Sequence, residues 1–218
     1  MIRDSMEIDG GEIMNLESIQ TKLKSHSPTI LGSEKFSKYA VMVPLIQKED
    51  GIHVLFEVRS LKLRRQPGEI CFPGGRIDPQ DKDEKSAAIR ETVEELGINS
   101  ENLSGVFPLD FMISPFGMMI YPFSAFIDNP EKIYPNAAEV EEVFTVPLTY
   151  FLTHDPDIYN IHFKVEPEEN FPFDLIVGGE NYNWRTRALD EYFYLYEEKA
   201  IWGLTAKILS HFIEILKQ

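Results

Sequence analysis

Residues 68–98 constrain the fold of this chain more than any other stretch. A short run at 69–72 is typical of a strand, and a proline and two glycines follow it as a tight turn. A polar loop comes next at 78–83, and residues 84–96 have the apolar spacing of an amphipathic helix. Gly97 stands where a helix-terminating glycine is expected. This region therefore predicts a strand, a glycine turn, an acidic loop and a helix in succession.

The predicted helix carries three glutamates on one face. Glu91, Glu94 and Glu95 are spaced i, i+3 and i+4, so their carboxylates lie side by side and repel one another. A divalent cation that prefers hard oxygen ligands, Mg²⁺ or Mn²⁺, compensates such a group. Arg90 precedes Glu94 by four residues and is expected to hold it by a salt bridge. The pattern indicates a metal site.

The two glycines of the turn, Gly74 and Gly75, bear on the same interpretation. Glycine allows a backbone carbonyl or amide to approach a metal or a phosphate closely. The alternative is ordinary: in a chain with 36 acidic residues, three glutamates on one helix face usually form a solvated surface. The joint order of strand, glycine turn, acidic loop and carboxylate-bearing helix favours the metal site.

The rest of the chain predicts a mixed α/β domain built in layers. Strands are expected at 39–46, 53–59, 103–113, 118–127 and 142–146, with weaker candidates at 159–165 and 174–177, and helices at 16–23 and 200–216. Residues 1–14 are polar and are expected to be a disordered extension. A single domain is expected over 15–218.

The composition excludes several classes of protein. A net charge of −15 argues against broad nucleic-acid binding, which needs a basic face. The longest apolar runs are too short to cross a membrane as helices, and the N-terminus lacks the apolar core of a secretory signal. Cys71 is the only cysteine, which excludes an internal disulfide and favours a cytoplasmic protein. An anionic substrate then requires a divalent cation or gathered bases to neutralise the site.

Residues 90–98 resemble the second half of the Nudix box, G-x5-E-x7-R-E-U-x-E-E-x-G-U, where U is aliphatic. Thr92 departs from the pattern, and the loop before the arginine is one residue longer than usual. The middle glutamate of the pattern has no counterpart in register, so Asp81, Asp83 and Glu84 are the candidates for its role. The resemblance implies an α/β (α+β) fold of the Nudix type, with a mixed β-sheet sandwiched between α-helices.

The segment 55–75 is similar to the signature of the coenzyme A pyrophosphatase branch of that family, L-L-x-x-R-[SA]-x3-R-x3-G-x3-F-P-G-G. The matching residues are Arg59-Ser60, Arg64, Gly68 and 72–75. An aspartate-rich loop after the glycines and Trp-Gly-Leu-Thr at 202–205 are similar to the same branch. The resemblance implies hydrolysis of the diphosphate of coenzyme A or its derivatives to 3′,5′-ADP and 4′-phosphopantetheine, or to an acyl form of the latter.

The resemblance also implies roles for particular residues. Glu91, Glu94 and Glu95 are the expected metal ligands, with the Gly75 carbonyl as a further one. One of these acids, or a later acid, activates water, and Glu139 is the favoured later acid. The alternative for Glu139 is a surface glutamate in an acidic turn.

Bases gather upstream of the glycine turn. Arg59, Lys62, Arg64 and Arg65 lie within seven residues of an acidic chain, and Arg76 follows the glycines. Arginine matches the geometry of phosphate oxygens, so these side chains are expected to bind the diphosphate and the 3′-phosphate of a coenzyme A-like nucleotide. A basic surface loop is the alternative reading.

Two other functions stay open. One is a Nudix pyrophosphatase of another nucleoside diphosphate derivative, such as ADP-ribose or a dinucleotide. The other is a non-catalytic nucleotide-sensing protein, against which the complete set of carboxylates argues. The sequence leaves the oligomeric state open, with a homodimer among the expectations.

Overall fold

The computed structural model describes residues 7–8, 12–13, 15–185 and 187–218. Contacts divide the chain into two units, Met1–Phe36 and Ser37–Gln218. The first unit contains the antiparallel pair β1 (Glu7–Ile8) and β2 (Glu12–Ile13), the helix α1 (Leu16–Ser25) and the 3-10 turn η1 (Ser33–Lys35). α1 confirms the helix predicted at 16–23. The disorder predicted for 1–14 falls mainly outside the described residues, and the single domain over 15–218 stays a prediction.

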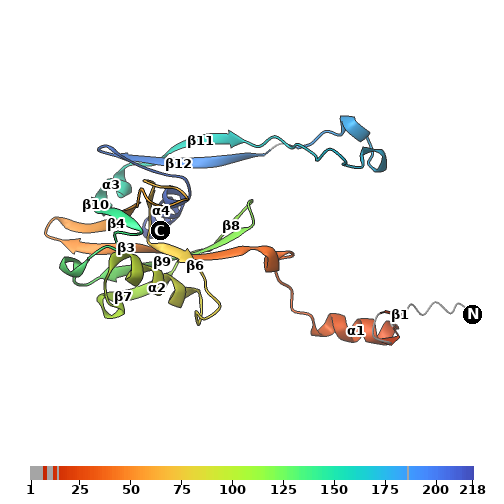
Figure 1. Cartoon of the computed structure of the whole chain (residues 1–218), viewed down its shortest axis with the longest axis horizontal. Coiled ribbons are helices and arrows are strands. Elements are labelled where there is room, and N and C mark those ends of the chain that lie inside the picture. Colours follow the sequence, from red (N-terminus) through yellow and green to blue (C-terminus); the bar gives the residue numbers. More distant parts are fainter. Residues whose placement is uncertain (1–6, 9–11, 14, 186) are drawn as a thin grey trace, which may run out of the picture. The chain divides into compact units, whose positions relative to one another are not determined.

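The second unit is built on one large mixed sheet (Figure 1). Its strand order is β10-β4-β3-β9-β7, and the short strands β5, β6 and β8 pair with β4, β3 and β9. β3 and β9 run parallel, whereas the other pairs are antiparallel. The strands are β3 (Ser37–Lys48), β4 (Gly51–Arg59), β5 (Ile70–Cys71), β6 (Gly74–Arg76), β7 (Leu103–Pro108), β8 (Met112–Ser114), β9 (Met118–Ile127) and β10 (Val140–Pro147).

Alternation along β3 divides the core between the two faces of the sheet. Ala40 and Met42 pack in one cluster with Ala87 and Ala88 of α2 (Glu84–Leu96). Val43, the next residue along β3, packs in another cluster that includes residues of α4 (Gly203–Leu216). Successive residues of a strand point to opposite faces, so one strand serves both clusters. The predicted sheet between helices is therefore confirmed.

The face with α4 also carries a second, three-stranded sheet (Figure 1). It consists of β11 (Asp157–His162), β12 (Ala188–Tyr196) and β13 (Lys199–Trp202) in the order β11-β12-β13. The short helix α3 (Leu148–Thr153) contacts β4, β10 and α4. The remaining 3-10 turns are η2 (Ser100–Asn102), η3 (Pro130–Lys132), η4 (Phe173–Leu175) and η5 (Gly179–Asn181).

Three predicted elements differ from the structure. The strand expected at 103–113 is split into β7 and β8, because Pro108 has no N–H to donate and ends β7. The strand expected at 174–177 is wrong: the turn η4 lies there, and Val177 is 94% exposed. The helix expected from residue 200 begins at Gly203, because the residues before it pair with β12 as β13.

Candidate active site

Neighbouring atoms leave no room for a side chain at either glycine of the turn. Gly74 and Gly75 belong to β6 and pair with Val41 and Ala40 of β3. A Cβ on Gly74 would lie 2.5 Å from the carbonyl oxygen of Ala40, and a Cβ on Gly75 would collide with the carboxylate of Glu91. The close approach predicted for these glycines is therefore present, and it brings the strand against the acidic helix.

Both ends of α2 are fixed by the residues that the sequence singled out. The side chain of Asp83 is the N-cap, and its Oδ1 accepts hydrogen bonds from the Ser86 backbone N–H at 2.7 Å and the Ser86 hydroxyl at 2.6 Å. These bonds hold the pKa of Asp83 below its ordinary value. Gly97 ends the helix with a φ of 62°, in the left-handed region expected of a terminating glycine.

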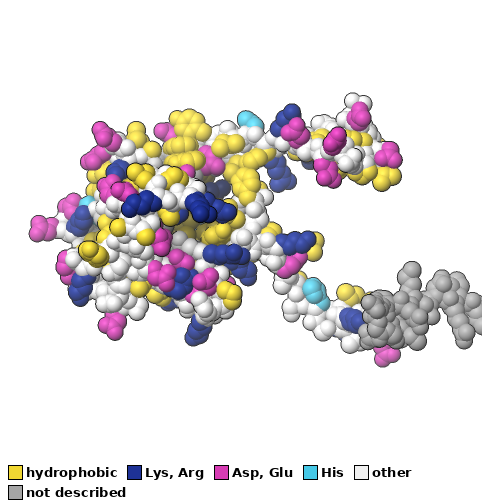
Figure 2. Space-filling view, viewed as in Figure 1, with side chains coloured by type: hydrophobic (Ala, Val, Ile, Leu, Met, Phe, Trp, Pro, Cys, Tyr) yellow, Lys and Arg dark blue, Asp and Glu magenta, His cyan; other side chains and the backbone are white. Residues whose placement is uncertain are grey.

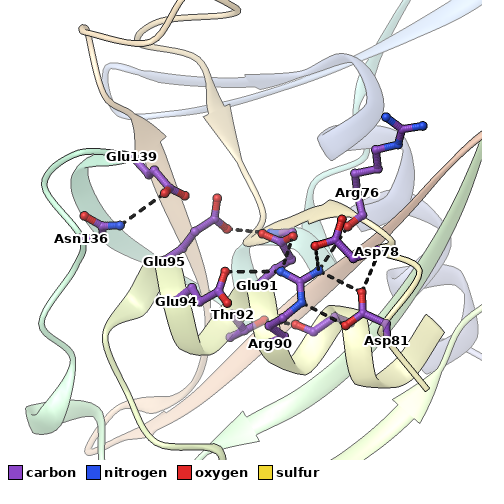
Figure 3. Close-up of polar contacts among 12 residues, drawn as sticks. Arg76, Asp78, Asp81, Arg90, Glu91, Thr92, Glu94, Glu95, Asn136 and Glu139 are labelled. Atoms are coloured by element: carbon purple, nitrogen blue, oxygen red, sulfur yellow. Dashed lines mark hydrogen bonds and ion pairs between the residues drawn. The ribbon is translucent and has the colours of Figure 1, made fainter. Parts of the chain in front are cut away.

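Arg90 connects the loop before α2 to the acids on the helix (Figure 3). Its Nε and Nη2 donate to the two carboxylate oxygens of Asp81, each at 3.0 Å. Nη1 donates to Glu91 at 2.7 Å and to Glu94 at 3.3 Å, and Nη2 reaches the backbone carbonyl of Arg76 at 3.2 Å. The predicted salt bridge to Glu94 is present, and the bond to Glu91 is the shorter one.

This arrangement separates the candidates for the middle acid of the Nudix box. Asp81 binds Arg90, and Asp83 caps the helix, so both carboxylates are engaged outside the acidic face. Glu84 is the first residue of α2 and lies six residues before Arg90. The role of a middle acid therefore stays a prediction for each of them.

Three of the predicted acids come together with one that the sequence did not single out. Glu95 is 4% exposed, and its Oε2 accepts a hydrogen bond from the Gly74 backbone N–H at 2.8 Å. Glu57 of β4 is 1% exposed. Burial raises the pKa of Glu95, of Glu57 and of Glu91, and the nearby carboxyl of Glu139 contributes to all three shifts.

Glu94 differs from these four acids, which we call the buried acid group: Glu57 and Glu95, which are buried, and Glu91 and Glu139, which are half-buried. Its side chain is 53% exposed and contacts Arg90. Glu139 accepts a weak hydrogen bond from the Asn136 side chain at 3.4 Å (Figure 3). Glu57, which sequence reasoning missed, had one signal: an acid within a strongly apolar strand must be buried or must point away from the core.

The predicted bases lie around the loop between β4 and β5. Arg59 closes this loop through backbone hydrogen bonds to Gly68 and Glu69, both at 2.9 Å. The Nε of Arg59 is buried and has no hydrogen-bond partner in the described part of the chain. Arg64 and Arg65 are exposed on the loop. Figure 2 shows Lys and Arg side chains gathering in the middle of the visible face, close to Asp and Glu side chains.

Arg76 contacts Arg90 through its backbone carbonyl and not through its guanidinium. Its carbonyl oxygen accepts a hydrogen bond from Arg90. Its guanidinium points away from Asp78 and Arg90 in Figure 3. The structure therefore leaves this guanidinium directed away from the groups that surround Arg90, as a phosphate-binding role requires.

The donor chemistry of the buried acid group fits a divalent cation. Carboxylate oxygens are the ligands that Mg²⁺ and Mn²⁺ prefer, and Glu57 Oε2 is buried without a hydrogen-bond partner among the described residues. Within the described residues, no three His, Cys, Asp or Glu side chains form a ready-made ligand set. Glu91 and Glu94 point toward Arg90, and the hydrogen bonds to Arg90 use one oxygen of each carboxylate, Oε1 of Glu91 and Oε2 of Glu94 (Figure 3).

A hollow on the α4 side of the sheet is lined by residues that do not belong to the buried acid group. It measures about 290 Å³ and is lined by Phe111, Met112, Lys207 and His211, among others. Its mixed apolar and basic lining differs from the buried acid group. None of the four acids of the buried acid group lines this hollow.

Comparisons with known proteins identify the family. Residues 37–170 match the NUDIX domain. The mouse peroxisomal coenzyme A diphosphatase NUDT7 is 42% identical over 123 residues, 56% of this chain and 51% of that protein. The human mitochondrial coenzyme A diphosphatase NUDT8 is 31% identical over 182 residues, 81% of this chain and 68% of that protein. The chain thus spans about half the length of the first of these relatives.

Among solved structures, a C. elegans Ap4A hydrolase in a binary complex matches 51% of this chain and 80% of that chain. The identity is 24% and the TM-score is 0.43. The domain match covers more than half of the 218 residues and includes the glycine turn, Arg90 and the buried acid group. The chain belongs to the Nudix family.

Proposed function

We propose that this protein hydrolyses the diphosphate bond of coenzyme A or its derivatives in the presence of Mg²⁺ or Mn²⁺. The products are 3′,5′-ADP and 4′-phosphopantetheine, or an acyl form of the latter. The observation that carries the proposal is that two acids of α2 meet the glycine turn: Glu91 lies against Gly75, and Glu95 accepts a hydrogen bond from the Gly74 N–H. The names of NUDT7 and NUDT8, both coenzyme A diphosphatases, support the choice of substrate.

The roles of individual residues follow from their positions. Glu91, Glu94 and Glu95, with the Gly75 carbonyl, would hold the cation, and a bound cation would supply positive charge at the reacting phosphate and lower the pKa of water. Arg90 keeps the side chains of Glu91 and Glu94 on one side of the helix. Glu139 lies near the other acids and accepts the proton of the attacking water.

A substrate panel tests this function. The full-length protein with Mg²⁺ or Mn²⁺ is given free coenzyme A, acyl forms, ADP-ribose, NADH and a dinucleotide, and the products are identified by mass. The proposal expects the highest kcat/KM for coenzyme A or an acyl form. Higher activity on ADP-ribose or a dinucleotide would favour another nucleoside diphosphate pyrophosphatase, and no turnover on any of them would favour a nucleotide sensor.

The bases around the β4–β5 loop are proposed to bind the phosphates of the substrate. Arg64→Ala is expected to lower the preference for coenzyme A over 3′-dephospho-coenzyme A by about tenfold, because a charge-assisted hydrogen bond contributes about 1.5–3 kcal/mol. The ratio of the two kcat/KM values measures this preference. The matched control is Arg187→Ala, which removes an exposed arginine outside this loop. An unchanged ratio in Arg64→Ala would show that Arg64 does not bind the 3′-phosphate.

The surroundings of the protein are predicted on separate grounds. Among the described residues, none of the helices combines the length and the apolar character needed to cross a bilayer. Cys71 is a free thiol, consistent with the reducing cytoplasm proposed from the sequence. The two relatives are named as peroxisomal and mitochondrial proteins. The compartment and a homodimeric state stay predictions, as does the absence of nucleic-acid partners.

A further inference from the structure

We infer that Glu57 supplies an additional carboxylate ligand for the divalent cation at this site. The inference rests on the proposed function, because it takes the cation as given. It goes beyond the Nudix box, since Glu57 lies on β4, upstream of the glycine turn.

The Glu57 side chain is buried with one carboxylate oxygen unpaired among the described residues. The residue is 1% exposed, and its Oε2 has no hydrogen-bond partner among the residues that the structure describes. Its Oε1 accepts only a weak hydrogen bond from the Cys71 thiol at 3.3 Å. A buried carboxylate with one oxygen unpaired is costly, so a strong partner for this oxygen is expected.

Glu57 lies close to the segments that carry the other acids. Cys71 of β5 lies directly opposite Glu57 in the strand register, three residues before Gly74, whose N–H donates to Glu95 of α2. On the other side, the backbone N–H of Ser60 donates to the Glu139 carbonyl at 2.8 Å, which ties the segment of Glu139 to the end of β4. Hydrogen bonds and strand pairing therefore connect the end of β4, where Glu57 lies, to the glycine turn beside α2 and to the segment of Glu139.

The charges of Glu57 and Glu95 are not balanced by a basic side chain. Both residues are buried, and among the described residues neither carboxylate forms an ion pair. Arg59 is the nearest base along β4, two residues after Glu57, but no ion pair joins the two in the described part of the chain. Several carboxylates buried together require a cation, and a divalent ion can bind more than one of them.

The competing explanation is that Glu57 is a permanently protonated, structural carboxyl. A neutral Glu57 hydroxyl could donate to a neighbouring acid, and it would need no metal. The two explanations differ in what happens when the charge is removed but the shape is kept. Loss of a ligand weakens metal binding, whereas replacement of a neutral carboxyl by an amide does not.

The test is direct measurement of Mn²⁺ binding to the full-length protein, by the electron paramagnetic resonance signal of free Mn²⁺, without substrate. Glu57→Gln is expected to bind Mn²⁺ about tenfold or more weakly than the wild type, because loss of groups at a metal site typically costs 10–100-fold in affinity. The matched control is Glu141→Gln, which removes an exposed carboxylate from the adjacent strand β10 and should bind like the wild type.

Wild-type Mn²⁺ affinity in a folded Glu57→Gln protein would overturn the inference and leave the proposed function standing. If Glu57→Gln does not fold, Glu57→Asp replaces it, because the shorter side chain keeps the charge but withdraws the oxygens. Unchanged affinity in that variant overturns the inference equally. A wild-type protein that binds Mn²⁺ but hydrolyses no diphosphate would instead refute the proposed function alone.

Discussion

Replacing Glu95 with glutamine is expected to reduce diphosphate hydrolysis by about 10²–10³-fold while the protein stays folded. The amide oxygen of glutamine can still accept the hydrogen bond from the Gly74 N–H, so the local structure survives. What disappears is a buried negative charge that the cation needs as a ligand. The measurement is kcat with coenzyme A at saturating Mg²⁺, together with the melting temperature.

The melting temperature of the metal-free protein, measured in EDTA, tests the role of Glu95 in a second way. Burial raises the pKa of Glu95 in the folded protein, so at neutral pH ionisation of this group opposes folding. Above the ordinary glutamate pKa, the free energy of unfolding of the metal-free wild type therefore falls as the pH rises toward the raised value. Glu95→Gln lacks this cost and should melt no lower than the wild type near neutral pH.

The control for Glu95→Gln is Glu101→Gln, which changes an exposed glutamate of η2 in the same way. It should retain wild-type kcat. Full activity in Glu95→Gln would remove Glu95 from the metal ligands. A large fall in melting temperature would mean that the carboxylate is ionised and structurally paired in the metal-free protein.

Alanine at the two glycines of the turn is expected to separate activity from stability. Gly75→Ala pushes the Cβ into the Glu91 carboxylate, the far end of a flexible side chain, which can move aside. A displaced ligand costs activity, by about 10²-fold for a shift of about 1 Å, with a small loss of stability. Gly74→Ala meets the Ala40 carbonyl and the Val41 Cα, which are backbone atoms that cannot move aside separately.

Gly74→Ala is therefore expected to lower the free energy of unfolding by about 1–3 kcal/mol, as overpacking typically does. Chemical denaturation measures this change in stability. The loss of activity expected for Gly75→Ala is measured as kcat, at a temperature where both variants are folded. Each variant is the control for its neighbour. The opposite pattern, with a stability loss in Gly75→Ala and an activity loss in Gly74→Ala, would contradict the described contacts.

The sequence predicted best what local chemistry determines. Asp83 and Gly97 bound a helix at both ends by capping, so the limits of α2 could be predicted without the fold. The strand predicted at 174–177 is wrong because strand formation needs a partner strand, which a short apolar run does not specify. Similarly, Ile201 fits a helical pattern but is held in β13 by its pairing with Tyr194.

The candidate site shows the same division between local and tertiary information. Glu91 and Glu95 could be predicted because helical spacing alone puts them on neighbouring positions of one face. The burial of Glu57 could not be predicted in this way, because it depends on tertiary pairing. β4 lies between β3 and β10, and its end pairs with β5. An acid in a strand has two faces to choose from, and only the packed sheet decides between them.

The bonding of Arg90 limits which residues position 90 can accommodate. One planar guanidinium donates two hydrogen bonds to the Asp81 carboxylate and, from its remaining nitrogen, one to Glu91. A lysine carries the same charge, but its single ammonium nitrogen cannot reproduce a fork with fixed geometry. Histidine is too short and has only two ring nitrogens. Among the natural amino acids, arginine alone can join the acidic loop to the helix in this way.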